Sequence, residues 1–287
     1  MDTRIYYFSA TGNCLSVAKR IAHGIDADIV SIAKEMQNDR VRIEARRIGI
    51  VFPAYLTSVM GLPLIVERFC RSIDYREDMR IFAVCTCGGY PFANAFVPLE
   101  KLKKLICKCG GQLDAAYSVR MPMNNLDYEH IPVPISKDIP KIIERANRKT
   151  DRIGRRILSG RGTRFVLLKW LTCRLVSGIY LAFRRQTMDV LAKMAKLDAD
   201  VSQPAERLVP LTDRSIVVRE HCIGCGTCAS VCPVQNIAMQ NGRPVYRHHC
   251  EMCFACDEWC PVGAIQHWSR ADGIKYHYPD VQVSDLL

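Results

Sequence analysis

The sequence has no uncharged apolar stretch long enough to cross a lipid bilayer. Its most apolar run is FVLLKWLTCRLVSGIYLAF at 165–183, which as a helix would span about 28 Å, nearly the thickness of the hydrocarbon core. However, Lys169 and Arg174 lie inside it, and each costs about 2.5–3.5 kcal/mol at the bilayer centre. We therefore predict no transmembrane span. A helix packed on another part of the chain is favoured, and peripheral contact with a membrane surface or with an acidic redox protein stays open.

No secretory signal peptide is predicted from the start of the sequence. The charged start MDTR runs directly into the strand-like residues IYYF, whereas a signal peptide has a longer apolar core before its cleavage site. The 15 cysteines are therefore not expected to form the disulfides of a secreted protein. We predict a reducing, cytoplasmic setting.

Acidic residues are scarce in one part of the chain. Residues 141–185 hold 13 lysines and arginines but only Glu144 and Asp151 as acids, a net charge of +11. The whole chain also carries a formal charge of +11, so the remaining residues sum to zero. The basic character therefore forms a single patch, which suits an acidic protein or an anionic surface. No nucleic-acid partner is expected.

A repeated cysteine pattern stands near the C-terminal end of the chain. CIGCGTCASVCP begins at Cys222, and CEMCFACDEWCP begins 28 residues later at Cys250. Each copy has the spacing Cys-x2-Cys-x2-Cys-x3-Cys-Pro of a [4Fe-4S] site, and in two-cluster ferredoxins the fourth cysteine of each run ligates the other cluster. We therefore predict two clusters with exchanged ligands. The ligands are Cys222, Cys225, Cys228 and Cys260 for cluster 1, and Cys250, Cys253, Cys256 and Cys232 for cluster 2.

Zinc and disulfides are the alternative uses of these cysteines. Zinc ribbons and RING domains pair two Cys-x2-Cys knuckles across a longer loop, which differs from three cysteines at two-residue gaps followed by a fourth. The pairs Cys85-x-Cys87 and Cys107-x-Cys109 do not predict a third metal site, because a free cysteine is commonly a small buried apolar residue.

The two cysteine runs differ in the residues between their ligands. Gly224 and Gly226 of the first run are matched by Met252 and Phe254 in the second. Small residues bring backbone N–H groups and water closer to sulfur, and bulky residues exclude water. The two clusters are therefore expected to differ in reduction potential.

The first half of the chain alternates apolar strands with amphipathic helices. The strands are predicted at Ile5–Phe8, Arg47–Tyr55, Arg80–Tyr90 and Gly111–Pro122, and the helices at Leu15–Ile25, Leu62–Ile73, Phe96–Cys107 and 139–157. Such an alternation indicates a parallel sheet with helices on both faces. In these sheets, ligands bind beyond the C-terminal ends of the strands, at the topological switch point.

Three loops leave the C-terminal ends of predicted strands, at Ser9–Cys14, Pro53–Ser58 and Thr86–Tyr90. The first loop reads SATGNC and precedes a helix, so it brings backbone N–H groups and the positive end of the helix dipole to one point, which suits a phosphate. It has neither the GK[ST] of a Walker loop nor a GxGxxG fingerprint.

With these loops and the two cysteine runs, the chain resembles the family of bacterial and archaeal flavodoxin-ferredoxin fusions. The resemblance implies an α/β fold with a flavodoxin-like doubly wound parallel sheet of order 2-1-3-4-5, followed by a small α+β ferredoxin domain with two [4Fe-4S] clusters. It also implies FMN as a cofactor. The residues that the resemblance assigns to FMN are Ser9, Thr11, Gly12, Asn13, Cys14, Pro53, Tyr55, Thr86, Cys87, Gly88 and Gly89.

Each of these residues has an implied role. The loop from Ser9 to Asn13 would hold the phosphate, Tyr55 would stack on the flavin, and Gly88 and Gly89 would let the backbone approach the ring edge. Cys14 departs from the family, since flavodoxins usually have Thr or Ser there and a thiol is a poor donor. Either its backbone N–H alone serves the phosphate, or Cys14 is a small buried residue at a helix start.

The same reading divides the chain into four parts: a flavodoxin-like FMN-binding domain at 1–158, a basic helical connector at 159–205, a ferredoxin-like domain at 206–270 and a C-terminal tail at 271–287. The segment Ala199–Ser215 is predicted to be the linker into the cluster domain.

Together these features predict an iron-sulfur flavoprotein. It would pass electrons between a low-potential, acidic ferredoxin-type donor, two [4Fe-4S] clusters and FMN, and then to an acceptor, in an anaerobic setting. No motif identifies a catalytic acid or base, and His130, His248 and His249 are the candidate proton donors. Two classes stay open: an oxidoreductase with a small-molecule acceptor, and a non-catalytic electron-transfer module with a degenerate or empty flavin site.

Overall fold

The computed structural model describes residues 2–38, 41–89, 94–123, 138–160, 183–197, 203–267 and 275–286. The chain splits into two compact units. Unit 1 comprises Met1–Ser9, Asn13–Pro122 and Asp138–Ala182, and unit 2 comprises Ala10–Gly12, Met123–Lys137 and Phe183–Leu287. Tyr90, His130 and nearly all of the apolar run at 165–183 lie outside the described residues.

Unit 1 is built on a five-stranded parallel sheet with the strand order β2-β1-β3-β4-β5. The strands are β1 Thr3–Tyr7, β2 Asp28–Ser31, β3 Arg47–Pro53, β4 Arg80–Cys87 and β5 Leu113–Arg120. This is the order of flavodoxin-like doubly wound sheets, so the predicted fold class of this half is confirmed. Strand β2 has no counterpart among the predicted strands, because its four residues begin with an exposed Asp28 and form no apolar run.

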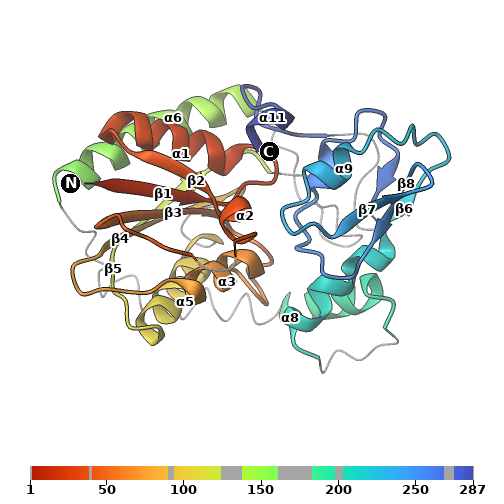
Figure 1. Ribbon diagram of the computed structural model, residues 1–287, viewed down its shortest axis with the longest axis horizontal. Helices are drawn as coiled ribbons and strands as arrows, with labels where there is room; N and C mark the ends of the chain where they lie inside the picture. The colour runs from red at the N-terminus through yellow and green to blue at the C-terminus, as the bar shows by residue number, and fades with distance from the viewer. Residues whose placement is uncertain are drawn as a thin grey trace. The chain divides into compact units, whose positions relative to one another are not determined.

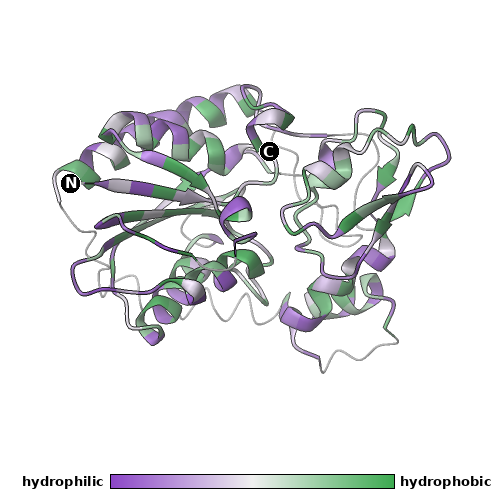
Figure 2. Cartoon of the chain, in the orientation of Figure 1, coloured by the Kyte–Doolittle hydropathy of each residue, from purple (hydrophilic) through white to green (hydrophobic). Residues whose placement is uncertain are grey.

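Helices cover both faces of this sheet (Figure 1). Helices α1 and α6 lie side by side on one face, and α3 and α5 lie together on the other. Their bounds are α1 Asn13–Ile25, α3 Leu64–Ser72, α5 Phe96–Lys108 and α6 Ile139–Leu158, and a short α2 spans Ile32–Glu35. Helix α6 buries Ala146, Ile153 and Ile157 at helical spacing, and its outer side is strongly hydrophilic (Figure 2).

The core of unit 1 consists of the inner strands β1, β3 and β4 and the helix faces that cover them. Every residue of β3 between Ile48 and Phe52 is buried, as expected for a strand with helices on both sides. Tyr6, Phe8 and Phe69 are among the largest fully buried side chains. Burial of one such side chain contributes roughly 1.5–3 kcal/mol, which fixes the strand ends where the candidate flavin loops begin.

Unit 2 contains two small antiparallel sheets and several short helices. Strand β6 Val217–Val218 pairs with β9 Ile265–Gln266, and β7 Ile237–Gln240 pairs with β8 Arg243–Tyr246. The helices are α8 Ala205–Leu208, the 3-10 helix η1 Val209–Ser215, α9 Thr227–Ser230, α10 Ala255–Glu258 and α11 Val283–Leu286, with a further helix at 183–194. Across the ranges described in both units, no helix has the length and apolarity that a membrane crossing requires.

The segment predicted as a linker is folded from Ala205 onward. Residues Ala205–Ser215 form α8 and η1, and Leu208, Val209 and Thr212 are completely buried. A polar residue of this segment forms a hydrogen bond within unit 2, since the Thr212 hydroxyl donates to the Val209 carbonyl at 2.8 Å. This segment therefore belongs to the packed structure around the cysteine loops.

Candidate iron-sulfur and flavin sites

The two cysteine loops have left-handed backbone at the same two positions. Gly224 and Met252, 28 residues apart, have φ of +67° and +52°, and Gly226 and Phe254 have φ of +76° and +62°. Each loop is followed by a one-turn helix, α9 or α10. A Cβ at Gly224 would lie 2.6 Å from the Gly242 carbonyl oxygen, so the first loop needs glycine there. The second loop adopts the same left-handed backbone with the larger residues Met252 and Phe254. In both loops these left-handed residues fall in the two-residue gaps between the cysteines.

Backbone N–H groups point at the sulfur atoms in both loops. Asn236 N–H donates to Cys232 Sγ and Ala264 N–H donates to Cys260 Sγ, each at 3.2 Å. These two contacts are again 28 residues apart. Such N–H···S bonds orient a cysteine ligand and stabilise negative charge on it, which is how proteins tune iron-sulfur sites.

One cavity brings together the four predicted ligands of cluster 2. Cys232 of the first run and Cys250, Cys253 and Cys256 of the second all line this cavity. The other lining residues are largely apolar. Burial raises the pKa of Cys250 to about 12 and that of Cys253 and Cys256 well above the usual value. Thiols in such surroundings become thiolates when a positive metal centre replaces the proton, so the donor set fits an iron-sulfur cluster.

The predicted ligands of cluster 1 lie around Cys228. Cys228 is buried in a small core with Ile237 and Ile265, against which Cys260 packs. Burial raises the pKa of Cys228 to about 11, and charge on Cys225 and Cys260 contributes to the rise. Cys225 is exposed and lies 3.3 Å from the Thr227 hydroxyl, which lowers the pKa of its thiol. The fourth predicted ligand, Cys222, is partly exposed, and its N–H donates to the Arg219 carbonyl at 3.2 Å. In the described ranges, no three His, Cys, Asp or Glu side chains are arranged around a single metal ion.

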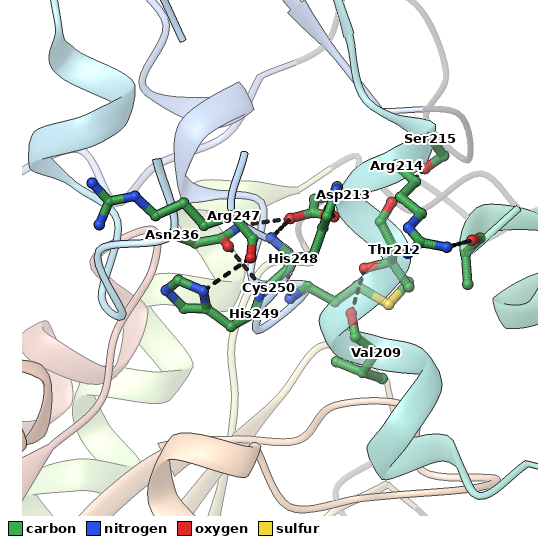
Figure 3. Close-up of polar contacts among 12 residues, drawn as sticks. Val209, Thr212, Asp213, Arg214, Ser215, Asn236, Arg247, His248, His249 and Cys250 are labelled. Carbon is green, nitrogen blue, oxygen red and sulfur yellow. Dashed lines mark hydrogen bonds and ion pairs between the residues drawn. The ribbon is translucent and has the colours of Figure 1, made fainter. Parts of the chain in front are cut away.

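A buried carboxylate holds the backbone segment directly before the second cysteine run (Figure 3). Asp213 is 2% exposed, and its oxygens accept from Asn236 Nδ2 at 2.8 Å and His248 N at 3.0 Å and contact His248 Nδ1 at 2.7 Å. Asn236 Oδ1 in turn accepts from His249 N at 2.8 Å. The two residues before Cys250 are thus tied to Asp213 and Asn236, and Cys250 N–H donates to the carbonyl of Pro210 at 3.0 Å.

Asp213 was not among the residues predicted from the sequence. The only available signal was an acidic residue in a short segment of apolar residues before the first cysteine, which is weak. His248 and His249, which were candidate proton donors, instead serve this network through their backbone N–H groups and, for His248, through Nδ1.

The candidate flavin loops of unit 1 meet at the C-terminal ends of β3 and β4. The Cys14 thiol lies 3.0 Å from the Thr86 hydroxyl, and Ala54 N–H donates to the Thr86 carbonyl at 2.8 Å. Cys14 is 1% exposed, and burial raises its pKa to about 12. This geometry favours the interpretation of Cys14 as a small buried residue at the start of α1.

Other predicted flavin residues are placed around the same edge. The ring of Tyr55, which follows β3, meets that of Phe8 edge to face at 6.1 Å. A Cβ at Gly89 would meet the side-chain amide of Asn94, which would have to move aside. Cys87 is 6% exposed, and burial raises its pKa to about 12. Pro53, at the end of β3, and Gly88, directly after β4, are partly exposed.

The predicted phosphate loop begins in unit 1, but its residues Ala10–Gly12 belong to unit 2. There, Trp259 Nε1 donates to the Ala10 carbonyl at 2.8 Å, and Tyr278 N–H donates to the Thr11 carbonyl at 2.7 Å. Gly12 has φ of +90°, and a Cβ would lie 2.9 Å from the Cβ atoms of Tyr278 and Val281. One side of Gly12 is therefore covered by the C-terminal segment.

The loop fits a phosphate through its backbone more than through its side chains. It ends at the N-terminus of α1, a 13-residue helix, where N–H groups and the helix dipole favour an anion. The Asn13 amide donates to the Pro122 carbonyl at 3.0 Å, and the Cys14 thiol contacts Thr86. A phosphate would therefore depend on backbone N–H groups and on the hydroxyls of Ser9 and Thr11.

Comparison with known proteins supports the cluster domain directly. Residues 215–238, which contain the first cysteine run, match the family model of the 4Fe-4S binding domain. No curated protein matches the chain.

Several solved structures resemble part of the chain. The flavodoxin of Streptococcus pneumoniae TIGR4 is 15% identical, with 54% of this chain and 99% of that chain covered and a TM-score of 0.35. Flavodoxin 1 from Bacillus cereus is 17% identical, with 53% and 98% covered and a TM-score of 0.33. An FMN-dependent NADH-azoreductase from Bacillus anthracis is 11% identical, with 55% and 99% covered and a TM-score of 0.35. The strand order of the sheet, and not these matches, assigns the fold of unit 1. The chain thus joins a flavodoxin-like doubly wound unit to a ferredoxin-type 4Fe-4S binding domain.

Proposed function

We propose that the protein is an iron-sulfur flavoprotein that passes electrons between a low-potential ferredoxin-type donor, two [4Fe-4S] clusters and FMN, and then to an acceptor. The cavity lined by Cys232 together with Cys250, Cys253 and Cys256 carries most of the argument. A two-cluster ferredoxin requires this exchange of the fourth cysteine between runs. The matched backbone of the other loop supports a second cluster held by Cys222, Cys225, Cys228 and Cys260. We also propose the four-part division at residues 158, 205 and 270.

The residues of the chain would divide the work as follows. The buried cysteines would bind iron as thiolates and keep water away from it. FMN, when bound, supplies both one-electron and two-electron chemistry, and so links the one-electron clusters to a two-electron acceptor. The backbone at the start of α1 would hold the phosphate, and Tyr55, packed against Phe8, would be placed to stack on a ring at the sheet edge.

An acidic electron donor suits the outer side of α6 (Figure 2). Its acids are neutralised, because Glu144 pairs with Arg148 and Asp151 pairs with Arg20, each at 2.6 Å. The exposed basic residues of the helix are Lys141, Arg145, Arg148, Arg152, Arg155 and Arg156. Electron transfer from an acidic ferredoxin should therefore slow as ionic strength rises. An electron-transfer rate that does not change with salt concentration would contradict this docking role. Salt-sensitive binding to anionic vesicles would point instead to a membrane surface.

A second candidate function is a non-catalytic electron-transfer module whose flavin site is empty. The packing of Tyr278 and Val281 against Gly12 favours it, as do the internal contacts of Asn13 and Cys14. In that case the flavodoxin-like unit would act as a scaffold for the cluster domain.

Cofactor analysis of anaerobically purified protein separates the two candidates. We expect about eight irons, about eight sulfides and about one FMN per chain. If the protein holds the expected iron but no flavin, and does not quench FMN fluorescence on titration, the flavodoxin-like unit would serve only as a scaffold. Zinc in place of iron would overturn both.

Single-cysteine variants test the exchange of ligands between the runs. If Cys232 serves cluster 2, Cys232→Ser should remove the same electron paramagnetic resonance signal as Cys253→Ser. Cys260→Ser should remove the same signal as Cys225→Ser. If Cys232→Ser instead behaves like Cys225→Ser, each run holds its own cluster and the proposed ligand sets are wrong.

A further inference from the structure

Tyr246 carries a buried hydroxyl that has no hydrogen-bond partner among the residues that the structure describes. It ends strand β8 and lies opposite Ile237 in the antiparallel pair with β7. Burying a hydroxyl without a partner is unfavourable, because the hydrogen bonds that it makes to water are lost. Because native proteins leave few such groups, an orphan hydroxyl indicates a partner that belongs in the site.

The surroundings of Tyr246 include cysteines of both runs. Tyr246 lines the cavity that is formed with Cys232, Cys250, Cys253 and Cys256. It also packs against the small core centred on Cys228. The phenol therefore lies among predicted ligands of both clusters, in a cavity that is otherwise largely apolar.

The hydroxyl is a permanent donor at this position. A phenol has an ordinary pKa of about 10, so it carries its proton at neutral pH, and Cys256 packs against the same small core as Tyr246. A phenol that keeps its proton can donate a hydrogen bond to a negatively charged sulfur.

The repeat gives Tyr246 no counterpart in the first half of the cluster domain. The two cysteine runs are related by an offset of 28 residues, and the residue 28 positions before Tyr246 is Val218, which ends β6. Valine has no hydroxyl. A hydrogen bond from Tyr246 would therefore act on one member of an otherwise repeated pair.

We propose that Tyr246 is a positioning residue that donates a hydrogen bond to a sulfur atom of cluster 2, on the side of Cys256, and thereby raises the reduction potential of that cluster. The proposal rests on the proposed function, since it requires cluster 2 to be present. Reduction adds one electron to a cluster, and a donor on sulfur stabilises the more negative state. The proton stays on the tyrosine throughout, so no bond breaks.

The test uses the full chain, purified anaerobically with both clusters, and the variant Tyr246→Phe. This change removes only the hydroxyl. We expect unchanged iron and sulfide content and a lower reduction potential for the cluster that Cys253→Ser abolishes, measured by redox titration with electron paramagnetic resonance. The other potential should move less. Tyr117→Phe is the matched control, because Tyr117 in unit 1 also has a buried hydroxyl without a partner in the described part of the chain, and it should shift neither potential.

A second substitution should shift the reduction potential of cluster 2 in the opposite direction. Replacing Tyr246 by 3,5-difluorotyrosine keeps the ring and makes the hydroxyl a stronger donor, so the same potential should rise. A merely structural role would not lower the potential in one variant and raise it in the other. The proposal is overturned if both variants hold two clusters with wild-type reduction potentials. It is also overturned if only the fluorinated protein assembles its clusters and the reduction potential of cluster 2 does not rise. A wild-type protein without two clusters would instead contradict the proposed function.

Discussion

The thiol of Cys14 lies 3.0 Å from the hydroxyl of Thr86, which ties the first turn of α1 to the end of β4. The two residues are 72 positions apart and belong to two of the three predicted flavin loops at the C-terminal edge of the sheet. This contact directs the Cys14 side chain toward the sheet. The departure from the usual Thr or Ser at this position therefore affects packing more than phosphate binding.

Cys14 should resist alkylation in the folded protein. Burial raises its pKa to about 12, so the reactive thiolate is scarce until the pH approaches that value. Iodoacetamide at about pH 8 should modify the exposed Cys107 and leave Cys14 unmodified, as measured by mass spectrometry of peptides. Denatured protein is the control, in which both should react. Equal labelling of the two cysteines in the native state would contradict the buried position.

Glu67 should make unit 1 less stable in acid. Burial raises the pKa of its carboxyl, but Arg71 at 2.7 Å and Lys101 at 3.4 Å outweigh this effect, and the pKa lies below its ordinary value. The stabilisation is therefore complete above the ordinary glutamate pKa of about 4.3 and is lost as the pH falls through the lowered folded value.

A Glu67→Gln variant measures this contribution. It should lower the free energy of unfolding by about 0.5–1 kcal/mol at neutral pH, and the difference from wild type should vanish in acid below the folded pKa. Urea unfolding followed by circular dichroism at several pH values gives the comparison. Glu77→Gln, at an exposed position, should have no such effect. A Glu67→Gln difference that persists in strong acid would argue against the ion pairs.

The apolar strands of unit 1 could be predicted because burial on both faces leaves a continuous hydrophobic run, as in β3 and β4. The cysteine loops could be predicted because the spacing itself determines the chemistry. Asp213 could not, since its partners Asn236 and His248 are 23 and 35 residues away and only folding brings them together. Phe254 could not either, because a left-handed turn normally calls for glycine.

The covering of Gly12 predicts unequal effects of alanine at two similar glycines. Gly12 and Gly110 have φ of +90° and +89°, so alanine carries about the same left-handed strain at each, roughly 1 kcal/mol. A Cβ at Gly110 meets no atom within 4 Å, whereas at Gly12 it meets Tyr278 and Val281 at 2.9 Å. Gly12→Ala should therefore lower the melting temperature more than Gly110→Ala and should speed proteolysis within residues 275–286. Equal losses with equal protection of this segment would show that the C-terminal residues do not cover the loop in solution.

The buried carboxylate of Asp213 should control how long cluster 2 is retained. Asp213→Asn keeps the shape but turns an amide nitrogen toward groups that need an acceptor, so we expect a loss of about 2–3 kcal/mol. Because His248 and Asn236 fix the backbone just before Cys250, the cost should appear as faster release of iron to a chelator under anaerobic conditions, by about tenfold or more. Glu220→Gln is the control, since Glu220 is an exposed acid of the same unit. Release at the wild-type rate from Asp213→Asn would mean that the network does not hold the second cysteine run, and that the chain entering Cys250 is fixed by the Pro210 carbonyl alone.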